Sequence, residues 1–136
     1  MAELNLAGEK HEVVFGNDSI VIRKYGHSLA GGRVLDVTGY AEKTVLAGHV
    51  IITDGNGTYK PMPVDGDAYA TLPEGYAYAG VLYRSILAAK PAASILNAGV
   101  VNEKALPYAI SSIKTAFATA CPHIMFESDE PVDTKA

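Results

Sequence analysis

Glycine divides this chain into short runs of β-favouring residues. The sequence holds 13 glycines in 136 residues, and valine, isoleucine, threonine and tyrosine are frequent between them. This pattern is typical of a small, mainly β domain with many short strands. The predicted strands are Val13–Phe15, Ser19–Tyr25, Arg33–Val37, Val45–Thr53, Thr58–Tyr59, Tyr76–Arg84, Ala93–Val101 and His123–Glu127.

A β-hairpin is predicted at Asp54–Gly57, whose sequence is Asp-Gly-Asn-Gly. It separates the apolar run Val50–Thr53 from Thr58–Lys60. Glycine and asparagine accept the positive φ angles that tight hairpin turns require. Prolines then follow and end the second strand, because proline brings no amide hydrogen to a ladder. The residues beyond them, Asp65–Gly75, are predicted to form a loop.

One helix is predicted from apolar residues spaced by four, three and four positions, which places them on a single helix face. Pro107 suits its first turn, Asn102 or a nearby residue is the expected cap, and Pro122 ends it. A shorter helical turn at Ser85–Ala89 has weaker support. The apolar residues of the predicted helix are Leu106, Ile110, Ile113 and Phe117.

Length and composition favour one associating domain. The 136 residues carry 11 basic and 15 acidic side chains, a net charge of −4 that disfavours nucleic acid as a partner. Hydrophobic residues make up 49% and charged residues 19%, which indicates a folded chain with apolar surface to cover. We predict a β-rich domain over residues 13–127, an N-terminal arm over 1–12 and a flexible acidic tail over 128–136.

No secretion signal or membrane segment is expected. The acidic N-terminus lacks the basic start and apolar stretch of a signal peptide. The most apolar region, Ile86–Val101, is interrupted by Lys90, Pro91 and Asn97, whereas a spanning helix needs about 20 mostly apolar residues. A single cysteine also leaves no internal disulfide to form.

Groups that could carry chemistry are few. Cys121 and His123 bring a thiol and an imidazole together, but a zinc site needs at least three protein ligands. The Asp54 loop resembles a calcium loop, yet Tyr59 stands where that loop needs glycine. No nucleophile motif surrounds the serines. We expect no metal, no cofactor and no catalysis, a structural role for His49, and a packed rather than reactive Cys121.

Tyrosine is concentrated near one predicted loop and the strand after it. Tyrosine buries a large area at low entropic cost and is enriched in protein interfaces, although core packing is the better account of at least half of these rings. The candidates for a trimer or partner interface are Tyr69, Tyr76, Tyr78 and Tyr83.

The order of several segments resembles the tailed-phage head decoration proteins, which include lambda-type cement proteins and head fibre proteins of gut phages. The similarity covers about residues 34–127. Compared with the shortest members of this family, the chain carries an additional segment, residues 13–37, before the shared core. The segments that carry it are Val45–Gly55, the proline-containing loop, Tyr78–Leu82, Leu96–Asn102, the predicted helix, and Pro122–Phe126.

This resemblance implies a small barrel-like domain of the β-tulip type, with one or two short helices, that assembles as a homotrimer. Such trimers bind the major capsid protein at three-fold positions on the outside of the head and stabilise it. The protein would be made in the host cytoplasm and end in the virion. By position, the arm that adds a strand to the capsid would include Leu4, Leu6, Val13 and Phe15.

Two alternatives remain at this stage. The first is a head fibre or display protein whose tyrosine-rich region, from Tyr69 to Tyr83, binds host or mucosal glycans, because aromatic rings stack on sugars. The second is a small hydrolase or metal-dependent enzyme that uses Cys121 and His123.

Overall fold

The structure is a computed structural model that describes residues 18–127. The predicted strand Val13–Phe15, the arm residues Leu4 and Leu6, and the acidic tail lie outside these residues. In the described part, strands form most of the regular structure, which confirms the mainly β prediction.

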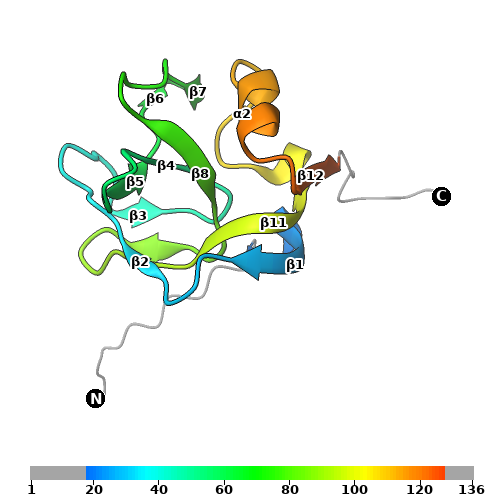
Figure 1. Cartoon of the computed structure of the whole chain (residues 1–136), viewed down its shortest axis with the longest axis horizontal. Helices are drawn as coiled ribbons and strands as arrows, with labels where there is room; N and C mark the ends of the chain where they lie inside the picture. Colours follow the sequence, from blue (N-terminus) through cyan, green and yellow to red (C-terminus); the bar gives the residue numbers. More distant parts are fainter. Residues whose placement is uncertain (1–17, 128–136) are drawn as a thin grey trace.

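The main sheet has the order β1-β11-β8-β4-β5, with neighbouring strands antiparallel, and β12 pairs parallel to β11 (Figure 1). The described strands do not close into a barrel, so the barrel-like arrangement is not seen in residues 18–127. The strands of this sheet are β1 (Ile22–Ser28), β4 (Val50–Thr53), β5 (Tyr59–Pro61), β8 (Ala77–Leu82), β11 (Ile95–Asn102) and β12 (Ile124–Glu127).

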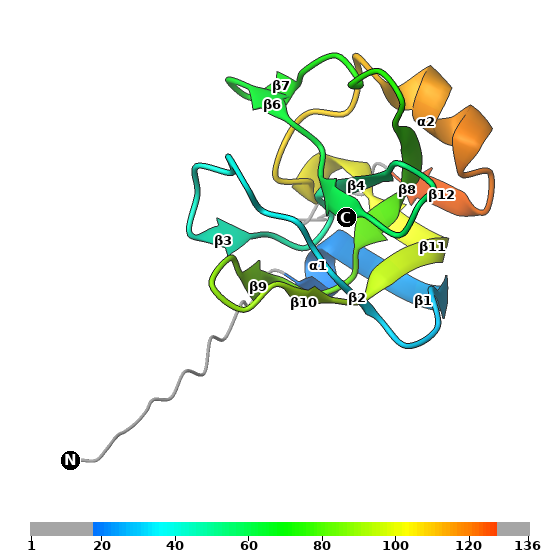
Figure 2. The same ribbon diagram turned by 60° about the vertical axis from the view of Figure 1, so that its left-hand side comes forward.

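Three two-stranded sheets and three short helices complete the described domain. The helix α2 lies beside β8 and β12, and β3 lies at the opposite end of the molecule in both views (Figures 1 and 2). The small sheets pair β2 (Arg33–Val34) with β10 (Ala92–Ala93), β3 (Thr44–Val45) with β9 (Ile86–Leu87), and β6 (Val64–Asp65) with β7 (Ala68–Tyr69). The helices are α1 (Asp18–Val21), the 3-10 helix η1 (Glu103–Ala105) and α2 (Lys114–Ala120).

The predicted hairpin is confirmed. Thr53 pairs with Tyr59 across β4 and β5, and the second strand ends at Pro61. The Asp54 carboxylate closes the turn by accepting the backbone N–H of Asn56 at 2.8 Å. The loop predicted over 65–75 is partly wrong, because β6 and β7 form a second small hairpin at its start.

The predicted long helix is wrong at its N-terminal half, since α2 begins only at Lys114. The preceding segment forms tertiary backbone contacts instead: the Ala109 N–H donates to the Asp67 carbonyl at 2.9 Å, and Ala109 bridges Ala68 in parallel register. These contacts compete with helical hydrogen bonds, although the apolar periodicity is that of a helix. The helix ends at Ala120, as expected from the proline that follows.

Two smaller helix predictions are also corrected. Asn102 caps η1 rather than the main helix, because its side chain accepts the Lys104 N–H at 3.2 Å. The segment around Ser85–Ala89 contains the strand β9 and no helical turn.

The core lies on both faces of β4. Val50 and Ile52 belong to one buried cluster, whereas Ile51 belongs to a second cluster on the other face. All three side chains are fully buried. Alternation along a strand sends successive side chains to opposite faces, so a continuous apolar run fits a strand covered on both sides.

Phe117 joins α2 to the first of these clusters. Its ring lies 5.5 Å from the ring of Tyr78 and 5.8 Å from that of Phe126, centroid to centroid. One short helix is thereby packed against two strands of the main sheet.

Candidate functional site

His49 is one of two buried polar residues in the described part of the chain, the other being Asn102, and it lies directly before β4. Its imidazole is fully buried, and its Nε2 lies 2.9 Å from the carbonyl oxygen of Met62. Since a carbonyl only accepts hydrogen bonds, Nε2 carries the hydrogen and Nδ1 carries a lone pair. That Nδ1 has no hydrogen-bond partner among residues 18–127.

Three tyrosine rings surround this imidazole. Tyr40, Tyr69 and Tyr108 each meet it edge to face, with ring centroids 5.8, 5.4 and 5.4 Å away. Tyr69 is also fixed through its hydroxyl oxygen, which accepts the Val50 N–H at 3.0 Å. We call His49, Tyr40, Tyr69 and Tyr108 the aromatic cluster.

Burial keeps His49 neutral. Removal from water lowers the pKa of the imidazole to about 4, and the hydrogen bond to the Met62 carbonyl opposes this shift only in part. A charged imidazole would have to sit among aromatic rings without compensation by water. At neutral pH the His49 imidazole is therefore uncharged.

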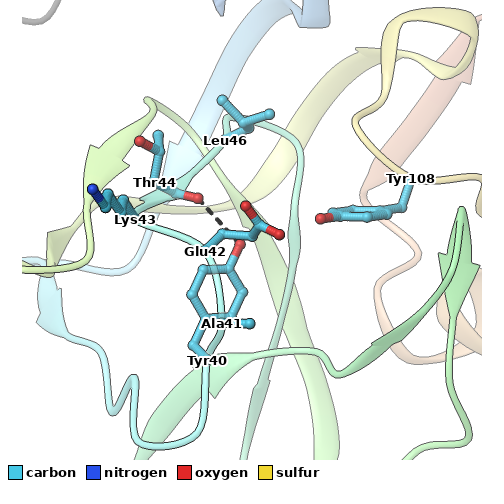
Figure 3. Close-up of a pocket in the computed structure, with 7 residues that line it drawn as sticks. All are labelled: Tyr40, Ala41, Glu42, Lys43, Thr44, Leu46 and Tyr108. Carbon is cyan, nitrogen blue, oxygen red and sulfur yellow. Dashed lines mark hydrogen bonds between the residues drawn. The ribbon is translucent and has the colours of Figure 1, made fainter.

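An open pocket of about 430 Å³ adjoins this cluster (Figure 3). Tyr40 and Tyr108 contact His49 and also line the pocket, so they separate the imidazole from the opening. We call this hollow the Tyr40 pocket. Its lining residues are Tyr40, Ala41, Glu42, Lys43, Thr44, Leu46 and Tyr108.

Backbone contacts hold both walls of the Tyr40 pocket. On one wall the Tyr40 hydroxyl donates to the Thr44 carbonyl at 3.2 Å, and the Lys43 carbonyl accepts the Ala88 N–H at 2.8 Å. On the other wall, the residue after Tyr108 makes the bridge to Ala68 described above. The pocket is thus formed by segments fixed independently of any ligand.

The four candidate interface tyrosines do not share one environment. Tyr69 is 5% exposed and has little surface to offer a second chain. Lys60 covers the ring of Tyr76 with its ammonium 4.5 Å from the centroid, and Tyr78 packs on Phe117. The sequence did not indicate that Tyr69 contacts His49. The rings of the aromatic cluster come from separate segments, and no local pattern connects them.

Tyr83 has a different pair of neighbours. Its ring lies 5.1 Å from that of the exposed Tyr25 on β1, and Arg84 lies 5.0 Å from its centroid. Tyr83 therefore packs against an exposed aromatic ring on the strand β1.

Cys121 and His123 line a second pocket, of about 340 Å³, to which β1 adds His27. The thiol is largely buried, and burial raises its pKa to about 11. Its Sγ lies 3.8 Å from the Tyr78 carbonyl oxygen. Within residues 18–127, no three His, Cys, Asp or Glu side chains lie close enough together to hold a metal ion.

Comparisons of the chain with protein-family models, with curated proteins and with solved structures give no match. No helix in the described part of the chain is both long and apolar enough to cross a membrane.

Proposed function

We propose that this protein is a structural subunit of a tailed-phage virion. It binds the outside of the head as a homotrimer, contacts the major capsid protein at three-fold positions, and stabilises the shell. The assignment to this class, and the trimer with it, rest on the resemblance of the sequence segments. The structure supports the more general part of the proposal, a surface that associates with other proteins.

The observation that carries the proposal is a sheet face at β1, β11 and β12 that is exposed within residues 18–127. Lys24 and Met125 are both in register with Val100, one on each side of it. Residues in register across neighbouring strands point to the same sheet face. Met125 is 63% exposed, and Lys24 is also exposed, so this row faces outward. We call Lys24, Val100 and Met125 the outer row.

The edge strand β1 extends this surface. The residues Arg23–His27 are exposed in succession, and Tyr25 alone exposes 49% of its surface. Edge strands present backbone groups to which another chain can add. Register shifts interrupt the pairing of β1 with β11, so β1 is an irregular strand. An irregular edge strand is a poor template for a long backbone ladder with an added chain. Side chains of the outer row would therefore supply much of the contact.

The first experiment measures the mass of the full chain by sedimentation equilibrium and its binding to expanded phage heads by co-sedimentation. We expect a mass of three chains and saturable binding to heads. A single-chain mass together with heads that stay unbound would contradict the proposal.

A substitution tests the exposed face. Met125→Ser should weaken subunit or head association about tenfold, because it removes apolar area that the contact buries. The matched control is Val34→Ser on β2, which removes an apolar side chain that is 72% exposed and belongs to a different sheet. Equal weakening by both variants would show that the outer row is not the contact.

The glycan-binding alternative has less support at the residues first considered for it. Stacking on a sugar needs a free aromatic face, yet Lys60 lies over Tyr76 and Arg84 over Tyr83. Tyr69 is buried in the aromatic cluster. A glycan array with the full chain tests this alternative directly, and binding lost on Tyr83→Ala would favour it.

A further inference from the structure

The Tyr40 pocket is rich in groups that attract positive charge. The Glu42 carboxylate lines it and is exposed to solvent, and no hydrogen bond or ion pair to it occurs within residues 18–127. The Tyr40 hydroxyl has already donated its hydrogen to the Thr44 carbonyl, so its oxygen is left with lone pairs. Tyr40 and Tyr108 also line the pocket, and aromatic rings carry partial negative charge on their faces.

The electrostatics agree with this composition. Burial, together with the neighbouring Tyr108 and Glu42, raises the pKa of Tyr40 to about 12. Glu42 lies near enough to the Tyr40 phenol for its negative charge to disfavour ionisation of that phenol. Tyr40 consequently remains protonated at neutral pH, and the Glu42 carboxylate is the acidic group of the pocket.

Lys43 also lines the pocket, but it makes no ion pair with Glu42 within residues 18–127. In Figure 3 its ammonium points away from the Glu42 carboxylate and from Tyr108, while the Tyr108 hydroxyl points toward Glu42. An anionic ligand would meet the carboxylate directly and gain little from the tyrosine rings. A cationic ligand would face the carboxylate and both rings.

The size and support of the pocket suit a small molecule. Its volume of about 430 Å³ lies within the range of small-ligand sites. Leu46, which is 42% exposed, adds an apolar surface at the opening. His49 packs behind both tyrosines and fixes their rings without adding charge, which is the arrangement of a preformed aromatic wall.

We propose that the Tyr40 pocket binds a small organic ammonium ion, with Glu42 as its counter-charge and the rings of Tyr40 and Tyr108 as its aromatic walls. His49 is a positioning residue that holds the two rings. This site is on the side of β3 and is argued independently of the outer row, so it does not depend on association with a phage head.

Titration of the full chain with choline, followed by two-dimensional amide NMR, tests this site. The matched neutral probe is 3,3-dimethyl-1-butanol, which has the same shape without the charge. We expect saturable shifts for the backbone amides of Glu42, Thr44 and Tyr108 with choline at about millimolar dissociation constant. The neutral probe should bind about 10- to 30-fold more weakly, since both the attraction to the Glu42 carboxylate and the cation–π attraction are lost.

Variants divide the contributions of charge and ring. Glu42→Gln should weaken choline binding about fivefold and leave binding of the neutral probe unchanged. Tyr108→Leu should weaken choline binding by a similar factor, whereas Tyr108→Phe should retain most of it because the ring remains. Glu74→Gln, at an exposed loop position outside the pocket, is the charge control and should have no effect.

Three results would overturn the proposal. They are the absence of saturation at roughly ten times the expected dissociation constant, equal binding of choline and the neutral probe, and equal effects of Glu42→Gln and Glu74→Gln. Thermal unfolding of each variant verifies that it is folded at the temperature of the titration. Loss of association with heads by Met125→Ser, with choline binding intact, would separate this site from the proposed function.

Discussion

The rings of His49 and Tyr108 meet edge to face, with centroids 5.4 Å apart and planes inclined by 79°. The contact joins the start of β4 to a segment near the C-terminus, which lie far apart in sequence. It connects the fully buried imidazole to a residue that lines the Tyr40 pocket. The core and the candidate binding site therefore share one wall.

Acidification should destabilise the fold through His49. Burial lowers its pKa to about 4 in the folded state, whereas the unfolded chain has the ordinary value of 6.5. Between these values the unfolded state binds the additional proton, so stability is full above the unfolded pKa and falls as pH decreases toward 4. We expect a loss of about 2 to 3 kcal/mol between pH 7.5 and pH 4.5, measured by urea unfolding.

His49→Phe is the comparison for this pH dependence. This variant lacks the titrating imidazole. Whatever its stability at pH 7.5, its free energy of unfolding should not show the decrease between pH 6.5 and pH 4 that His49 causes. An unchanged slope in this variant would mean that other groups produce the acid sensitivity.

Gly48→Ala, next to His49, should lower the free energy of unfolding. Gly48 has φ +90°, and an added Cβ would lie 2.6 Å from Cγ1 of Val21 and 2.9 Å from Cδ2 of Leu106. We expect a loss of about 2 to 4 kcal/mol in urea unfolding, from backbone strain and from overpacking.

The matched control is Gly57→Ala. Gly57 has φ +98°, but an added Cβ there meets no atom within 4 Å. Gly57→Ala has the same cost of placing alanine at a positive φ angle, but no steric clash. The difference in unfolding free energy between the two variants therefore measures the clash with Val21 and Leu106. Equal losses would show that the neighbours move aside.

Phe117→Ala should lower the free energy of unfolding by about 3 to 5 kcal/mol, because it leaves a cavity between α2 and the main sheet. The side chain is fully buried and contacts the rings of Tyr78 and Phe126. Urea unfolding gives the value, and Met125→Ala, at a position 63% exposed, should change the stability by less than about 0.5 kcal/mol. A loss in Phe117→Ala as small as in the control would place α2 outside the cooperative core.

Cys121 should resist alkylation. Burial raises its pKa from 9.0 to about 11, so the thiolate that reacts is scarce at pH 8. We expect iodoacetamide to react about 100-fold more slowly with the folded chain than with the chain in urea. The sequence has one cysteine, so mass spectrometry reports this site alone. Similar rates in both states would favour the hypothesis of an enzyme that uses Cys121 and His123.

The local predictions succeeded where a turn or a strand is encoded by adjacent residues. The hairpin at Asp54–Gly57 formed because glycine φ angles and an aspartate hydrogen bond act within a few residues. The helix from Leu106 failed in its first half, since Ala109 pairs with distant residues. The periodicity still marked which side chains are buried, because Ile110, Ile113 and Phe117 lie in the core.

The amino-acid sequence alone determined the class of fold, the hairpin and the end of α2, since strand preference, turn geometry and proline act locally. Only the tertiary structure decided that Tyr40, His49 and Tyr108 meet, and that Lys24 and Met125 lie in one row. These relationships depend on strand pairing and packing between distant segments, and no short-range pattern of residues specifies which rings or rows become neighbours.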